Sequence, residues 1–378
     1  MAVLTEEQSL IKAQASAWVI DKAPVASFRA LRDDPTQGGF SRSTWQSMVD
    51  MGWSGILAPE ACGGSDLGYL TFGLILEQLG RQLTASPLLA SSLVGVSGVL
   101  LAGSPEQQAA LLPGLVDGST LLTLALDEGA RHLPQQVTLT ATAVDGGYVL
   151  NGSKTFVAEG MAATHFLIVA RTHGATDDAH GRSFFIVAAD SPGLQRHALA
   201  TVDSRDHAQL TLGDVTVDAS ALLGELHNAG ATLDALLDRA RVAVAAEMLG
   251  TAAQAFDMTL DYLKTREQFG SVIGSFQALG HRAAALFSAQ EQARSCVEAA
   301  LQAIDDKADN IAELASLAKC HVGKFLHAMS NELIQIHGGI GMTDEFDAGF
   351  YLKRARVLEA SYGNRAFHRD RYATLLGF

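Results

Sequence analysis

Three glycines near the C-terminal end have a spacing that suggests ligand chemistry. Gly338, Gly339 and Gly341 lie in QIHGGIGMTDE (335–345), between two stretches that look helical. Glycine lets bare backbone approach a ligand closely, so this segment is a candidate phosphate cradle. It is equally consistent with a plain turn between helices, in which His337 either contacts a phosphate or fills the turn. If the segment is a phosphate cradle, the chain is expected to carry a nucleotide cofactor.

Glu247 is the second residue that attracts attention. It is the only charged residue in the segment VAVAAEMLG (242–250). A lone carboxylate among Ala, Val, Met and Leu is costly to bury unless it has a partner or a chemical task. One hypothesis makes Glu247 a desolvated catalytic base. The other makes it a structural carboxylate paired with Arg241, Arg282 or another arginine.

The composition narrows the class of protein. A formal net charge of −14 over 378 residues argues against a nucleic-acid partner, because no basic stripe is available to replace phosphate counterions. The three cysteines are widely spaced and predict neither a disulfide framework nor a metal site. The N-terminus lacks a signal-peptide pattern, and no apolar stretch is long enough to span a bilayer. We therefore expect a cytoplasmic protein without a membrane partner.

Three zones of the sequence differ in periodicity. Residues 1–118 look helical, residues 119–222 contain six to eight short alternating segments, and residues 223–378 are helical again. DGG (145–147) and NG (151–152) are expected turns within the middle zone. The last zone contains four helical patterns, at 226–264, 274–305, 309–337 and from 344 onward. The predicted fold is α+β and multidomain: an N-terminal helical domain, a middle antiparallel β domain and a C-terminal four-helix bundle.

Two long segments resemble the acyl-CoA dehydrogenase family. They are KTREQFGSVIGSFQALGHRAA (264–284) and ELIQIHGGIGMTDEFDAGFYLKRAR (332–356). The resemblance covers nearly the whole chain, in the family's α–β–α order. It implies an FAD-dependent enzyme that dehydrogenates an acyl-CoA thioester and passes electrons to an electron-transfer flavoprotein. It also implies a homotetramer or heterotetramer, with FAD bound across a subunit interface.

The resemblance assigns FAD contacts residue by residue. Arg266 would bind the pyrophosphate, and Phe269 would lie near the adenosine half; the plainer alternatives are an exposed helix-end arginine and a core anchor. The remaining contacts that the resemblance implies, to the FAD of a neighbouring subunit, come from Gln277, Gln335, Gly338 and Gly339.

The β domain departs from the usual family pattern. Phe156 stands where a tryptophan is common and can still cover the flavin ring, but Ala158 replaces a hydroxyl residue. The segment LALDEGARH (124–132) replaces the usual Thr-Glu-Pro segment.

The family's catalytic base is missing from both of its usual positions. Those positions are Tyr362, a poor base at neutral pH, and Ala240. Glu247 lies seven residues after Ala240, about 10.5 Å further along the same helix, and is our candidate base. Glu359 is the next candidate.

Three functions remain open from the sequence. The first is dehydrogenation by this chain, with a bulky, branched or steroid-type acyl group. The second is a non-catalytic or flavin-sharing subunit of a heterotetrameric acyl-CoA dehydrogenase. The third is a flavin oxidase or monooxygenase on the same fold. Small residues on the helix around Ala240 favour a wide acyl group, although plain helix packing explains them as well.

Overall fold

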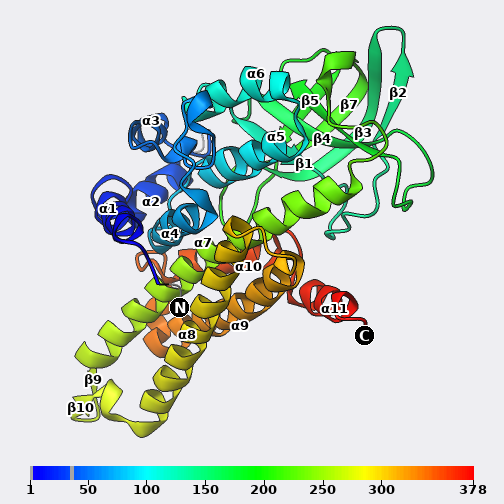
Figure 1. Ribbon diagram of the computed structural model, residues 1–378. Coiled ribbons are helices and arrows are strands. Elements are labelled where there is room, and N and C mark those ends of the chain that lie inside the picture. Colours follow the sequence, from blue (N-terminus) through cyan, green and yellow to red (C-terminus); the bar gives the residue numbers. More distant parts are fainter. Residues whose placement is uncertain (1–2, 35–37) are drawn as a thin grey trace. The chain divides into compact units, whose positions relative to one another are not determined.

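The computed structural model describes residues 3–34 and 38–378 (Figure 1). Contacts divide the chain into two compact units. The helical unit comprises the chain up to Ala30 together with Tyr69–Thr84 and Arg241–Phe378, and the sheet unit comprises Leu31–Gly68 and Ala85–Ala240. Each unit is described by itself below.

The sheet unit is built on an eight-stranded sheet in the order β6-β7-β3-β2-β4-β5-β8, with β1 paired to β4. Its strands are β1 (Leu122–Ala125), β2 (Thr140–Val144), β3 (Gly147–Ala158), β4 (His165–Arg171), β5 (Arg182–Ala188), β6 (Leu194–Ala198), β7 (His207–Asp218) and β8 (Leu222–Leu223). Its helices are α3 (Arg42–Asp50), η2 (Trp53–Gly55), η3 (Glu60–Cys62), η4 (Leu88–Gly95), α5 (Val96–Ala102), α6 (Pro105–Val116) and η5 (Ala219–Ala221).

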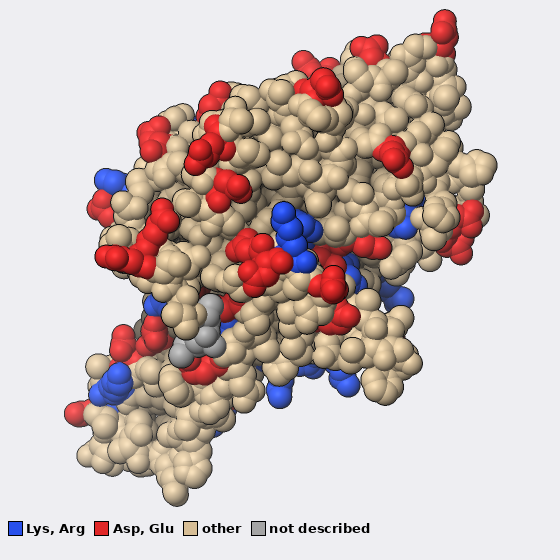
Figure 2. Space-filling model, in the orientation of Figure 1, with Lys and Arg blue, Asp and Glu red and all other residues tan. Residues whose placement is uncertain are grey.

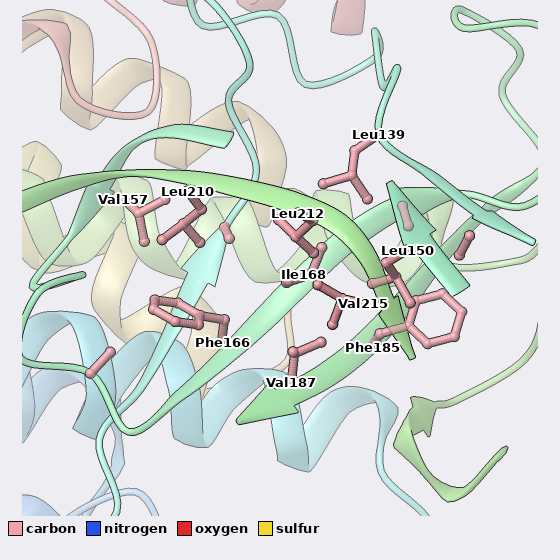
Figure 3. Packing of buried hydrophobic residues seen from close by; sticks show 14 of the residues in the cluster. Leu139, Leu150, Val157, Phe166, Ile168, Phe185, Val187, Leu210, Leu212 and Val215 are labelled. Atoms are coloured by element: carbon pink, nitrogen blue, oxygen red, sulfur yellow. The ribbon is translucent and has the colours of Figure 1, made fainter. Parts of the chain in front are cut away.

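The core of this sheet comes from alternate residues of its central strands. Phe166 and Ile168 of β4 pack with Phe185 of β5 and with Leu210 and Leu212 of β7 (Figure 3). Such alternation is what period-2 strands present to one buried face. The β-rich middle zone read from the sequence therefore forms a single sheet with its own apolar core.

Two details of the expected β structure were wrong. The sheet is not wholly antiparallel, because β1 runs parallel to β4, with Leu122 opposite His165. The NG dipeptide is not a turn: Asn151 and Gly152 lie inside β3, where the register with β7 shifts. Gly152 has φ of 140°, a backbone conformation suited to glycine, so the dipeptide makes a strand irregularity.

The helical unit contains most of the C-terminal region. Its elements are α1 (Glu6–Lys22), the first part of α2 (Val25–Asp33), nearly all of α4 (Gly68–Arg81), the second part of α7 (Gly230–Thr265), β9 (Glu267–Gln268), β10 (Ser271–Val272), η6 (Ile273–Ser275), α8 (Gln277–Asp305), α9 (Ile311–His337), η7 (Gly338–Met342), α10 (Ala348–Ala360) and α11 (Arg365–Leu375). In Figure 1, α8 and α9 pack along each other. The pattern expected from residue 344 onward is divided, because Tyr362 and Gly363 have positive φ and Asn364 caps a new helix.

Helices α4 and α7 cross at very short range through a pair of glycines. A Cβ on Gly80 would lie 2.3 Å from the Glu247 carbonyl oxygen, and one on Gly250 would lie 1.8 Å from the Glu77 carbonyl oxygen. The hydroxyl of Thr251 donates to the carbonyl oxygens of both Glu247 (2.9 Å) and Gly80 (3.2 Å). The backbone of Glu247 is thus fixed against α4.

Charged side chains of both signs occur on the face that Figure 2 shows, with acidic groups spread over it. The excess of acidic residues gives the formal net charge of −14. Across residues 3–34 and 38–378, we find no helix with the length and apolar character needed to cross a membrane.

Gly250→Ala should destabilise the helical unit. The added methyl group meets the backbone of α4 rather than a flexible side chain, so we expect a loss of about 3 kcal/mol in the free energy of unfolding. The matched control is Gly349→Ala in α10, where a Cβ would meet no atom within 4 Å. Urea unfolding of both variants checks this, and equal midpoints would contradict the close crossing.

Candidate functional site

Three separate stretches of the helical unit meet at one small apolar cluster. Its buried members are Leu263 at the end of α7, Ile273 in η6 and Ile336 at the end of α9. Tyr262 and Leu279 pack against them. Because the cluster joins these helix ends, it brings the segment from Arg266 to Gln277 to the segment from Gln335 to Gly339.

The first of these segments exposes its candidate FAD contacts. Arg266 follows the last residue of α7, donates its backbone N–H to the Tyr262 carbonyl (2.9 Å) and has an exposed side chain. Phe269 occupies the turn of the β9–β10 hairpin, is 94% exposed and has φ of 53°. The core-anchor alternative for Phe269 is therefore excluded. Gln277 is the exposed first residue of α8.

The glycine turn presents bare backbone, as its sequence suggested. Gly338 has φ of 61° and ψ of −133°, a conformation open essentially to glycine alone. A Cβ on Gly338 or on Gly339 would meet no atom within 4 Å, so the backbone is accessible there. Gln335 is exposed in the last turn of α9. The Gly338 N–H donates to the Ile334 carbonyl, but the open space beside Gly338 and Gly339 fits the approach of a phosphate to this backbone.

His337 fills the turn from inside. Its Nδ1 donates to the Leu333 carbonyl (2.7 Å), and its ring stacks on Tyr262 at 4.3 Å and lies 4.7 Å from Phe346. Burial lowers the pKa of His337, although the bond to Leu333 acts the other way. A neutral, stacked imidazole supports the turn-filling alternative over a phosphate contact.

The candidate flavin-ring contact lies in the sheet unit. Phe156 is 52% exposed and has φ of 52°, within the register shift of β3 between Lys154 and Val157. Lys154 is buried, and its Nζ donates to the Leu126 carbonyl (3.0 Å) and to Glu128 Oε1 (2.7 Å). The segment 124–132 therefore anchors the strand that displays Phe156. Sequence reasoning missed Glu128 as the partner of Lys154.

Glu247 is buried and ion-paired. It is 8% exposed, and Arg354 of α10 donates to its Oε1 from Nε (2.9 Å) and from Nη2 (2.7 Å). Arg282 instead pairs with Glu332 (2.7 Å). The sequence alternative of an arginine partner is thus realised, with Arg354 as that arginine.

Neither of the two usual base positions carries a carboxylate. Ala240 is fully buried and carries no titratable group. The Tyr362 carbonyl accepts from Arg241 Nε (3.3 Å) and from His368 Nε2 (3.2 Å). Burial, reinforced by nearby Lys319, Arg241 and Arg371, lowers the pKa of His368 to about 2. His368 is therefore neutral, with its hydrogen on Nε2.

Glu359, the second candidate base, takes part in a different group of side chains. It accepts from Arg356 Nη1 (2.7 Å) and lies 3.1 Å from His327 Nδ1. Both carboxylate oxygens of Glu359 therefore have a side-chain partner within this group.

Comparison with known proteins places these features in one family. The acyl-CoA dehydrogenase N-terminal domain matches residues 5–119, the middle domain residues 127–216 and the C-terminal domain residues 229–376. The chain belongs to the acyl-CoA dehydrogenase family. Membership confirms the predicted family, the helical–sheet–helical fold class, the oxidoreductase activity and FAD as the cofactor of this flavoprotein family. Members of the family are tetrameric.

Several relatives refine the comparison. Acyl-CoA dehydrogenase FadE27 of Mycobacterium tuberculosis is 31% identical over 340 residues, which cover 87% of each chain. A variant of the Tcur3481–Tcur3483 steroid ACAD is 31% identical, with a TM-score of 0.88 and coverage of 98% of both chains. The ChsE4–ChsE5 complex from Mycobacterium tuberculosis is 29% identical, with a TM-score of 0.89 and coverage of 100% of this chain and 99% of that chain.

The buried Lys319 should make stability depend on pH. Burial, with a smaller contribution from Arg241, lowers the pKa of Lys319 from 10.5 to about 7, while its Nζ donates to the Leu358 carbonyl (2.8 Å). At a pH between about 7 and 10.5, Lys319 is protonated in the unfolded chain but mostly neutral in the folded chain. The free energy of unfolding should therefore rise with pH over that window, by up to about 1.4 kcal/mol per pH unit from this group.

Lys319→Met should remove that contribution and stabilise the protein most at pH 7 and below. Denaturant unfolding at pH 6, 7, 8 and 9 measures the difference between the two proteins. A difference that stays constant across this range would contradict the lowered pKa of Lys319.

Proposed function

We propose that this chain is a subunit of an acyl-CoA dehydrogenase whose FAD is held across a subunit interface. One observation supports the proposal most strongly. One apolar cluster is surrounded by exposed residues, namely Arg266, Phe269, Gln277, Gln335, Gly338 and Gly339. An almost fully exposed phenylalanine with positive φ is poorly explained in an isolated subunit, because it gains neither burial nor relief of strain.

Each residue has a role suited to its chemistry. The guanidinium of Arg266 can form paired hydrogen bonds to the pyrophosphate of FAD. Gly338 and Gly339 leave room for the cofactor to approach the backbone in the same region, and Gln277 and Gln335 offer amide donors and acceptors. Phe156 of the sheet unit supplies an apolar face for a flavin ring. FAD, when bound, would accept the hydride from the substrate β-carbon.

Glu247 is our candidate for the group that removes the substrate α-proton. Its backbone is fixed by the α4–α7 crossing, and its carboxylate is buried, as a positioned base requires. The two bonds from Arg354 orient the carboxylate through Oε1. In this role the proton would pass to Glu247 while the carboxylate remains anchored on α10.

The substrate and electron acceptor follow from similar reasoning. Ala240, Ala243 and Ala246 place only small side chains on α7, which suits a bulky or steroid-type acyl group. Similarity to a steroid ACAD agrees with this substrate class. We propose an electron-transfer flavoprotein as the acceptor, in keeping with the dehydrogenases of the family.

The ion pair between Glu247 and Arg354 favours a second function. A carboxylate engaged by an arginine can be structural, and a partner subunit would then supply the base. Similarity to the ChsE4–ChsE5 complex, named for two different components, agrees with a heteromeric assembly. In that case this chain contributes FAD contacts to a site completed by its partner.

Paired substitutions at Glu247 and Arg354 separate the two roles. Glu247→Gln removes the basic carboxylate, and Arg354→Met breaks the same ion pair but keeps the carboxylate. If Glu247 is the base, the first variant should bleach its flavin with an accepted acyl-CoA at least about a thousand-fold more slowly under anaerobic conditions, and the second, which keeps the carboxylate but loses the bonds that orient it, should be slowed much less. FAD content and melting temperature are measured alongside. Similar loss of stability in both variants with bleaching retained would assign Glu247 a structural role only.

Flavin absorbance tests whether a different subunit is required. The chain purified alone should be yellow and bleach with steroid side-chain or branched acyl-CoA thioesters if it is self-sufficient. A colourless product that becomes yellow only after co-expression with a related subunit would establish the heteromeric function instead. The matched measurement is the ratio of flavin to protein in each preparation.

A further inference from the structure

We propose that Arg29 of α2 is a positioning residue for the glycine turn Gly338–Met342 and thereby sets the affinity of that turn for FAD. The inference rests on the proposed approach of Gly338 and Gly339 to FAD. Arg29 lies outside both motifs that identify the family, 315 residues before Asp344 in the chain. It does not itself need to touch the cofactor.

The contacts of Arg29 are concentrated just beyond the turn. Its Nη1 donates to the Asp344 carbonyl (2.6 Å) and to Asp344 Oδ2 (3.3 Å), and its Nη2 donates to Asp347 Oδ1 (2.6 Å). Its guanidinium lies over the Phe350 ring, 4.5 Å from the centroid. The planar guanidinium of Arg29 thus contacts a backbone carbonyl, two carboxylates and an aromatic ring. A lysine ammonium cannot reproduce that combination.

Packing of neighbouring side chains keeps the Arg29 guanidinium in place. Phe28, which is 6% exposed, meets Phe350 edge to face with ring centroids 5.3 Å apart. The Arg29 side chain is only 26% exposed, so its ion pair with Asp347 is partly shielded from water. Phe28 and Arg29 together attach α2 to the start of α10.

The turn is a short 3₁₀ helix whose two ends are held by different groups. Gly338 adopts a conformation open essentially to glycine. Thr343 donates to the Ile340 carbonyl from its N–H (3.1 Å) and from its hydroxyl (2.9 Å). The stacked His337 fixes the α9 side of the turn. Arg29 fixes the opposite side, where residues 343–347 form no helix or strand. A turn ordered before binding loses less conformational entropy when it meets its ligand.

Arg29→Ala should therefore weaken FAD binding. If the binding-ready turn falls to about one fifth of the population, the apparent Kd for FAD rises about five-fold. The purified assembly is stripped of FAD and titrated with FAD by flavin fluorescence, and its melting temperature is recorded. Arg29→Lys should restore only part of the affinity. Lys22→Ala is the matched control, since Lys22 is an exposed cation paired with its neighbour Asp21.

The outcomes distinguish the inference from the proposed function. Gly339→Ala adds a methyl group that meets no atom of the chain, so it should preserve the fold and weaken FAD binding if backbone approaches FAD there. An unchanged Kd in Gly339→Ala overturns the proposed FAD contact and the role of Arg29 with it. Weaker binding in Gly339→Ala, but not in Arg29→Ala, overturns the role of Arg29 alone. A lower melting temperature in Arg29→Ala with an unchanged Kd makes Arg29 merely structural.

Discussion

The helical unit depends on the close approach of α4 to α7. Gly80 and Gly250 remove the side chains that would otherwise separate these two backbones. At the same crossing each helix contributes a buried glutamate that reaches another helix. Glu77 of α4 binds Arg294 of α8 (2.8 Å), and Glu247 of α7 binds Arg354 of α10 (2.7 Å). Removing one partner from such a pair is far more damaging than replacing both, because a buried charge is left behind.

Glu77 and Glu247 differ in the charged groups that surround them. Burial raises the pKa of Glu77, but Arg294 and Lys12 more than offset that effect, and the net pKa is lowered. With two cationic partners, Glu77 is well suited to a structural role. Glu247 has its arginine bonds directed to one oxygen. This ion pair offsets the cost of burying Glu247 and, in the proposed catalytic role, would limit how readily its carboxylate accepts a proton.

The other end of the helical unit leaves large apolar side chains exposed. There the chain keeps an ordered apolar cluster inside, while Phe269 and Met342 are 94% and 77% exposed. Large apolar side chains in such positions are typical of surfaces that another molecule covers. If FAD is held across a subunit interface, as we propose, assembly would bury these groups and complete the FAD site together.

The sequence alone determined the family and the three-zone order, because these depend on local motifs and periodicity. The residues that approach FAD, and the loss of the usual base at Tyr362 and Ala240, stay predictions from the family resemblance. The sequence could not choose among Arg241, Arg282 and another arginine as the partner of Glu247, because Arg354 reaches it from a helix 107 residues away. Nor could it show that NG lies inside a strand or that Arg29 binds Asp344 and Asp347. Strand register and ion pairs between distant helices are set by packing of the whole unit, and only the tertiary structure decided them.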